Sequence, residues 1–62
     1  MTAADVLAGD RVRLDGGVEM LVSRIERPLL GLDGLMAFIE DTPARWYKHA
    51  ASPDAEVEVA RV

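Results

Sequence analysis

The sequence contains no cysteine, asparagine or glutamine, a single lysine, and only three aromatic residues among its 62 residues. Without cysteine the chain cannot form a disulfide, and with only one histidine it has too few nitrogen and sulfur ligands for a typical zinc site. We therefore expect no metal and no cofactor. The scarcity of aromatic rings also weakens two recognition modes, polyproline binding and methyl-lysine cages, because each needs several rings around one ligand.

Basic residues and long apolar runs are scarce as well. Eleven acidic residues against seven basic ones give a net charge of −4, whereas free nucleic-acid-binding domains are usually basic because phosphate neutralisation drives their affinity. No stretch approaches the roughly 20 apolar residues of a transmembrane helix. The first residues also lack the basic and apolar regions of a signal peptide. We expect a cytoplasmic protein without a membrane partner.

The amino-acid usage gives one hint of origin. Nine alanines and six arginines contrast with one lysine and no asparagine. Alanine and arginine have GC-rich codons, whereas lysine and asparagine have AT-rich ones. We infer a GC-rich genome, such as that of an actinobacterium or one of its phages, and a phage protein of this kind would act in the host cytoplasm.

Short alternations of polar and apolar residues are abundant, and they predict β-strands. The five expected strands cover residues 10–14, 18–27, 35–40, 44–49 and 55–62. The glycines of Asp15-Gly16-Gly17 supply the positive φ that a tight hairpin between the first two strands needs. In the second strand the period of two breaks between Val22 and Ile25. We therefore expect a bend near Ser23 and Arg24 that lets this strand serve two sheets.

These strands predict an all-β fold, a small five-stranded SH3-like barrel with a short N-terminal lead, formed as a single domain over residues 1–62. The residues that carry a resemblance are Leu7-x-Gly9-Asp10-x-Val12-x-Leu14, Gly17, Met20-x-Val22-x-x-Ile25 and, more weakly, Val57-x-Val59-x-Arg61. This pattern resembles small SH3-like barrel proteins, including KOW-type modules and short proteins of bacteria and phages. The resemblance implies a fold rather than one function, since this fold hosts binders of peptides, RNA, DNA and proteins. An OB-fold is the main alternative, although it usually needs a longer chain.

Residues capable of catalysis do not form a recognisable motif. The only histidine is His49, and none of the serine, threonine or tyrosine hydroxyls lies in a nucleophile motif. Glu40 and Asp41 are adjacent, and neighbouring side chains of a strand point to opposite faces. The sequence therefore indicates that the protein is not an enzyme.

Apolar residues are more numerous than we expect a core of this size to need. The surplus set consists of Leu29, Leu30, Leu32, Met36 and Phe38. We expect part of this set to be exposed and to contact another protein or a second copy of the chain. Trp46 is a further candidate, because tryptophan is enriched at interface hot spots, and we expect it either in the core or at such an interface. The sequence thus favours a protein-interaction or structural module that can self-associate.

The alternative function is nucleic-acid binding through the stretch Arg45-Trp46-Tyr47-Lys48. Interleaved basic and aromatic residues can stack a base and contact its phosphates. This function requires an exposed ring of Trp46 or Tyr47 beside free cations, and the acidic net charge opposes it.

The outward-facing charges give one geometric expectation. In SH3-like barrels the first and last strands are close neighbours. We therefore expect Arg11 and Arg13 to form cross-strand ion pairs with Glu56 and Glu58, each contributing little because solvent screens it.

Overall fold

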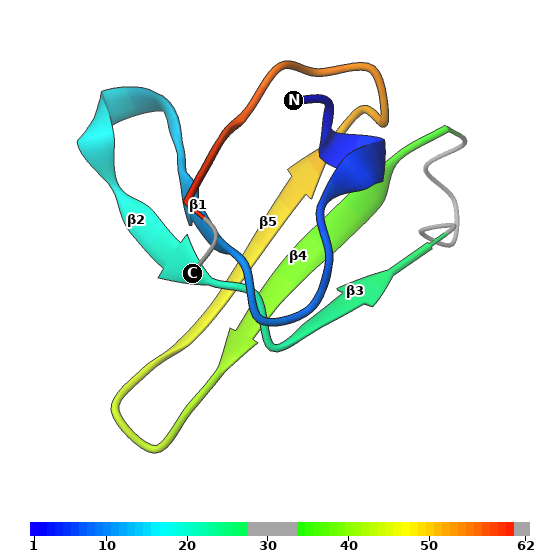
Figure 1. Cartoon of the computed structure of the whole chain (residues 1–62). Helices are drawn as coiled ribbons and strands as arrows, with labels where there is room; N and C mark the ends of the chain where they lie inside the picture. The colour runs from blue at the N-terminus through cyan, green and yellow to red at the C-terminus, as the bar shows by residue number, and fades with distance from the viewer. Residues whose placement is uncertain (28–33, 61–62) are drawn as a thin grey trace.

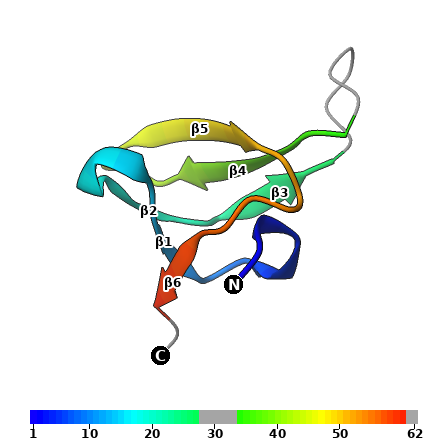
Figure 2. The same ribbon diagram turned by 90° about the horizontal axis from the view of Figure 1, so that it is seen from above.

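The computed structural model describes residues 1–27 and 34–60, and these form six short strands in two three-stranded antiparallel sheets (Figure 1). The elements are the 3₁₀ turns η1 (Ala3–Asp5) and η2 (Asp15–Gly17) and the strands β1 (Arg11–Arg13), β2 (Glu19–Leu21), β3 (Arg24–Glu26), β4 (Met36–Asp41), β5 (Trp46–Ala51) and β6 (Glu58–Ala60). The strand order is β2-β1-β6 in one sheet and β3-β4-β5 in the other. Figure 2 shows β3, β4 and β5 as one layer, with β1, β6 and η1 on one side of it.

The expected all-β class is confirmed, but the described strands do not form a closed five-stranded barrel. The second expected strand is interrupted at Val22 and Ser23, so that it becomes β2 and β3. Strand β2 pairs with β1 and β3 pairs with β4, which confirms the predicted bend that serves two sheets. Among the described strands no ladder joins the two sheets, and the count is six rather than five.

Two turns explain why glycine occupies its positions in the first half of the chain. In the hairpin between β1 and β2, Gly16 and Gly17 both have φ of +84°, and the amide of Leu14 donates to the carbonyl of Val18 at 2.7 Å. Gly9 has φ of +97°. Residues with a side chain rarely adopt a positive φ of this size, so these positions favour glycine.

The turn before β1 is held by Asp10. Its carboxylate accepts a hydrogen bond from the amide of Leu7 at 2.9 Å, and its carbonyl accepts one from the amide of Val22 at 2.9 Å. The Gly9-Asp10 pair of the SH3-like pattern therefore has a structural role in this chain, because it fixes the turn that leads into the first sheet.

The core lies between the two sheets. Its fully buried side chains include Val6, Val12, Met20, Val22, Met36 and Phe38. Strand β4 is buried from Met36 to Glu40, so both of its faces are covered. This resolves the ambiguous facing of its apolar run, because Met36 and Phe38 belong to the core cluster while Ala37 and Ile39 lie on the opposite face.

The N-terminal lead closes one end of the core. The amide of Ala3 donates to the carbonyl of Ala55 at 2.8 Å, and the amide of Val57 donates to the carbonyl of Met1 at 2.9 Å. Ala3 itself is fully buried. The first residues therefore occupy backbone positions along the segment before β6, and within the described part of the strand expected over residues 55–62, β6 begins at Glu58.

Candidate interaction surface

Trp46 is the most exposed aromatic side chain of the described chain. It is the first residue of β5, and 58% of its surface is accessible. Burial alternates along β5, so that Trp46 and Lys48 share the outer face while Tyr47 faces the core and packs against it. Trp46 and Tyr47 therefore point to opposite faces, and of the two places expected for Trp46, the core is wrong.

Within the described residues, the backbone of β5 is hydrogen-bonded on one side only. Strand β4 pairs with it over its full length, and no other described strand lies along its second edge. Such an edge carries unpaired amide and carbonyl groups that can accept another strand. Strand β5 has six residues, contains no proline and has Lys48 as its one formally charged residue at neutral pH. Natural proteins use several devices to block edge pairing, and β5 has only this lysine.

The hairpin register shows which backbone groups face this open edge. Thr42 and Arg45 exchange two backbone hydrogen bonds, at 3.0 and 3.2 Å, and hydrogen-bonded pairs alternate with non-hydrogen-bonded pairs along an antiparallel ladder. Lys48 lies opposite Ile39 at a non-hydrogen-bonded position, and the carbonyl of Ile39 accepts a bond from the amide of Ser23 on the other side, at 2.7 Å. The residues whose backbone groups point away from β4 are therefore Trp46, Lys48 and Ala50. We call these three residues the β5 edge surface.

Ion pairs cover the rest of the outer face of this sheet. Ile39 lies between Arg24 and Lys48 in the register and is only 1% exposed. Arg24 pairs with Asp41 at 2.8 Å, and Lys48 pairs with Glu26 at 3.1 Å. Because long charged side chains cover apolar surface with their stems, the tryptophan ring is the large apolar group that stays exposed on this face.

Glu40 and Arg45 form the best-connected charged pair in the described chain. The Arg45 guanidinium donates from Nε and Nη2 to the two carboxylate oxygens of Glu40, at 2.9 and 2.8 Å. The amide of Leu21 donates to Glu40 at 2.9 Å, and Arg45 also donates to the carbonyl of Glu19 at 2.7 Å. These bonds connect the two sheets. The guanidinium of Arg45 and the Leu21 amide lower the pKa of Glu40 from 4.5 to about 2.

The four residues of the alternative nucleic-acid site are not brought to one surface. Trp46 and Lys48 lie on the outer face, whereas Arg45 lies on the inner side with its guanidinium 5.7 Å from the ring centre of Tyr47. The charge of Arg45 is balanced by Glu40. The Lys48 ammonium has its own carboxylate partner, so neither cation of the stretch is unpaired.

The structure describes two residues of the surplus apolar set. Met36 and Phe38 are completely buried. Met36 and Phe38 are therefore not the exposed part of this set, because β4 is the central strand of its sheet and its inner face packs against the first sheet. Leu29, Leu30 and Leu32 lie outside the described residues, and their expected role stays a prediction.

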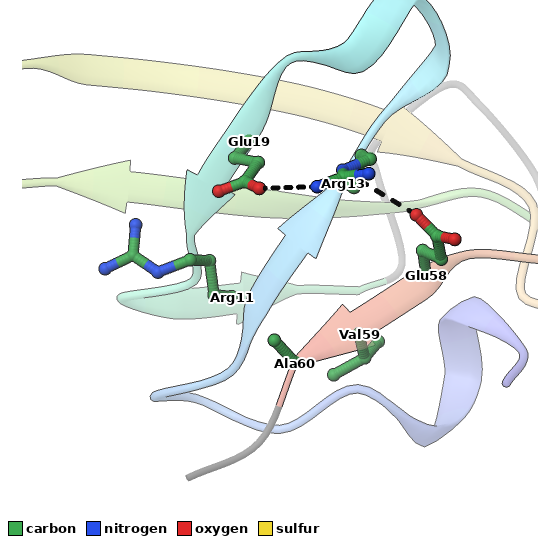
Figure 3. A pocket seen from close by; sticks show the side chains of 6 residues that line it. All are labelled: Arg11, Arg13, Glu19, Glu58, Val59 and Ala60. Atoms are coloured by element: carbon green, nitrogen blue, oxygen red, sulfur yellow. Dashed lines mark hydrogen bonds and ion pairs between the residues drawn. The ribbon is translucent and has the colours of Figure 1, made fainter.

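A shallow pocket of about 340 Å³ lies on the outer face of the other sheet (Figure 3). Arg13 crosses it between Glu19, at 3.0 Å, and Glu58, at 3.7 Å. The expected neighbourhood of the first and last strands is confirmed, and so is the ion pair between Arg13 and Glu58. Glu56 instead pairs with the amino terminus, at 3.2 Å. Arg11 points away from these carboxylates in Figure 3.

Titratable groups do not converge elsewhere on the described surface. His49 lies opposite Phe38, with the two rings stacked at a centroid distance of 6.5 Å. Glu40 and Asp41 point to opposite faces, as predicted, and each pairs with a different arginine. Within residues 1–27 and 34–60, no three histidine, aspartate or glutamate side chains are grouped as metal ligands.

No helix in the described part of the chain has the length and apolar character needed to cross a membrane.

Sequence reasoning missed two features of this surface. The first is the ion pair that joins the sheets, and the second is the open edge of β5. The open edge follows from the strand order β3-β4-β5. The ion pair depends on the turn after β4, which places Ala44 in a two-residue loop with Pro43 rather than at the start of the expected strand over residues 44–49. Had the turn been centred on these two residues, the register alone would have placed Arg45 beside Glu40.

Comparisons with protein-family models, with curated proteins and with solved structures find no match for this chain.

Proposed function

We propose that this chain is a protein-interaction module without chemistry of its own, and that it binds its partner through the β5 edge surface. The observation that carries the proposal is the exposure of Trp46 beside an unpaired strand edge. Tryptophan loses a large apolar area from water when a partner covers it, and it is enriched among residues that dominate binding energies. An open edge adds main-chain hydrogen bonds, which is how extended segments bind to many sheets.

We further propose that the two sheets are an SH3-like arrangement in which the barrel is left open. Two observations support this reading. One bent segment supplies β2 to the first sheet and β3 to the second, and the first and last strands of the chain are neighbours. The reading bears on fold alone, because this architecture is used by binders of several classes.

The distribution of charge supports a protein partner over a polyanion. Arg13, Arg24, Arg45 and Lys48 each lie within 4.0 Å of a carboxylate of the same chain. A phosphate would have to displace these partners, and the net charge of −4 would oppose its approach. The tryptophan ring needs no such displacement in order to bind an apolar group.

Partner capture with matched variants tests the proposal. The wild-type chain, Trp46→Ala and Leu7→Ala are immobilised and exposed to lysate of the native host. Leu7 is the control, because it is 60% exposed, close to the 58% of Trp46, but belongs to the turn before β1 in the other sheet. We expect a protein that the wild type and Leu7→Ala retain and that Trp46→Ala loses. Equal retention by all three variants would contradict the proposed surface.

A second candidate function is single-stranded nucleic-acid binding by Trp46 and Lys48, which share an exposed face. A base stacked on the ring would contribute about 1–3 kcal/mol, and added salt would weaken binding steeply. Titration of random single-stranded DNA at two salt concentrations distinguishes the candidates. Salt-sensitive binding that Trp46→Ala abolishes without a change in melting temperature would favour nucleic acid, whereas absence of binding favours the protein partner.

A further inference from the structure

We propose that the partner of the β5 edge surface is a second copy of the chain. Two β5 strands pair antiparallel about a two-fold axis, in the register that places Trp46 opposite the partner's Lys48. This inference rests on the proposed function, since it identifies the occupant of the same surface. It makes the two three-stranded sheets that contain β5 into one continuous six-stranded sheet.

The backbone geometry limits the registers that are available. In an antiparallel pair, residues that bond to one another must both direct their amide and carbonyl groups across the gap. On β5 these are the alternate residues of the β5 edge surface. A symmetric pair can therefore be centred on any residue of β5 from Trp46 to Ala51, and strand overlap and side chains decide among these six registers.

Four of the registers have an evident defect. Centring on Lys48 places the two lysines directly opposite one another, and like charges at such positions are destabilising. Centring on Trp46 or on Ala51 makes the two β5 strands overlap at one residue only, and centring on Ala50 leaves Trp46 outside the overlap.

The other two registers differ in what faces Trp46. Centring on His49 places Trp46 opposite Ser52, beyond the end of the strand, and Lys48 opposite Ala50. Centring on Tyr47 places each tryptophan opposite the partner's lysine, twice by symmetry. A cation over the face of a tryptophan ring is attracted to it. Because Trp46 and Lys48 are two residues apart, an antiparallel copy of β5 places the partner's lysine opposite the tryptophan and the partner's tryptophan opposite the lysine. The edge is thus complementary to a second copy of itself.

The inner face is compatible with this register. Tyr47 would lie opposite the partner's Tyr47 at a non-hydrogen-bonded position, where side chains approach closely and aromatic pairs stabilise the sheet. Tyr47 is half-buried in the single chain. Lys48 reaches across β4 to Glu26 on β3, at 3.1 Å and away from the open edge. On pairing, the ammonium therefore exchanges this exposed ion pair, which contributes little because solvent screens it, for the partner's ring.

The short overlap predicts a weak association. Interfaces of small area characterise transient complexes. We therefore expect a dimer that forms with rising concentration and dissociates on dilution. In sedimentation equilibrium the wild type and Leu7→Ala should show this concentration dependence, and Trp46→Ala should stay monomeric.

Introduced cysteines test the register, because the natural chain has none. Directly opposed hydrogen-bonded residues have Cα atoms about 5.5 Å apart, within the range of a disulfide. Trp46→Cys and Lys48→Cys change exposed side chains, so neither should disturb the fold. A mixed dimer of these two variants also keeps one native pair of Trp46 and the partner's Lys48.

We expect the mixture to form the mixed disulfide faster than either variant alone forms its homodimer. Leu7→Cys mixed with Lys48→Cys measures the rate of random collisions. A faster homodisulfide of Lys48→Cys would overturn the proposed register, as would a mixed disulfide no faster than the collision control.

A wild type that stays monomeric at millimolar concentration would overturn self-pairing altogether. The proposed function would survive that result if Trp46→Ala still lost a captured protein. It would fail separately if capture did not depend on Trp46.

Discussion

Arg45 binds Glu40 with two hydrogen bonds, at 2.9 and 2.8 Å, around the turn that joins β4 to β5. The pair fixes the start of β5, where Trp46 follows directly. Because Glu40 also accepts the amide of Leu21, at 2.9 Å, the same carboxylate connects the turn to the first sheet. The exposed tryptophan therefore directly follows an arginine that is fixed by a carboxylate bonded to both sheets.

Removing the charge of Glu40 should destabilise the fold. Glu40→Gln keeps the shape of the side chain and one acceptor for the Leu21 amide, but it leaves the guanidinium of Arg45 without its counter-charge. We expect a lower melting temperature by circular dichroism. Asp41→Asn is the control, because this neighbouring carboxylate pairs with Arg24 on an exposed face. The two variants melting at the same temperature would argue against a special role for the inner pair.

The stability contributed by Glu40 should depend on pH in the acid range. Its pKa is lowered from 4.5 to about 2 in the folded chain, so the unfolded chain binds the proton more tightly. The stabilisation is complete above the unfolded value and is lost as pH falls through the folded value. The difference in melting temperature between wild type and Glu40→Gln should thus shrink between pH 4.5 and about 2. A difference that stays constant over this range would contradict the lowered pKa.

Phe38 should be essential to the core rather than to binding. It is completely buried on the central strand of its sheet. Phe38→Ala should cost about 3–5 kcal/mol, a large part of the total stability of a small domain, whereas Leu7→Ala should change stability by no more than about 0.5 kcal/mol. Urea denaturation measures both. A Phe38→Ala variant that kept its stability but lost partner binding would contradict the core role and indicate that Phe38 contacts the partner.

Gly9 should resist substitution for a backbone reason. Its φ is +97°, and a side-chain Cβ there would meet no atom within 4 Å. Gly9→Ala should therefore cost about 1–3 kcal/mol through backbone strain alone. The exposed neighbour gives a matched control, Ala8→Ser, which should leave the denaturation midpoint unchanged. Equal midpoints for the two variants would show that the turn can change its conformation at no cost.

Local sequence patterns predicted the parts of the fold that depend on neighbouring residues. Alternation along β1 and β2, the glycine turn between them and the bend at Ser23 follow from a few adjacent positions each. The pairing of the first and last strands was expected from the resemblance to SH3-like barrels, and the ion pair between Arg13 and Glu58 lies across these two strands. The all-β class followed from the same short patterns.

The features that were not predicted depend on contacts distant in sequence. Met36 and Phe38 were counted as surplus to a small core, and only the packing of the two sheets shows that both faces of β4 are covered. The open edge of β5 is likewise a property of strand order. Trp46 was identified as the decisive residue from its type, but its exposure follows from the position of the turn before it.

The fluorescence of Trp46 tests the central claim most directly, because it is the only tryptophan of the chain. In the dilute protein we expect emission typical of a solvated ring and efficient quenching by acrylamide. Binding of the captured partner, or association at high concentration, should shift the emission to shorter wavelength and protect the ring from the quencher. Leu7→Ala should behave in the same way. Association that leaves both the emission and the quenching of Trp46 unchanged would show that the β5 edge surface is not where the chain binds.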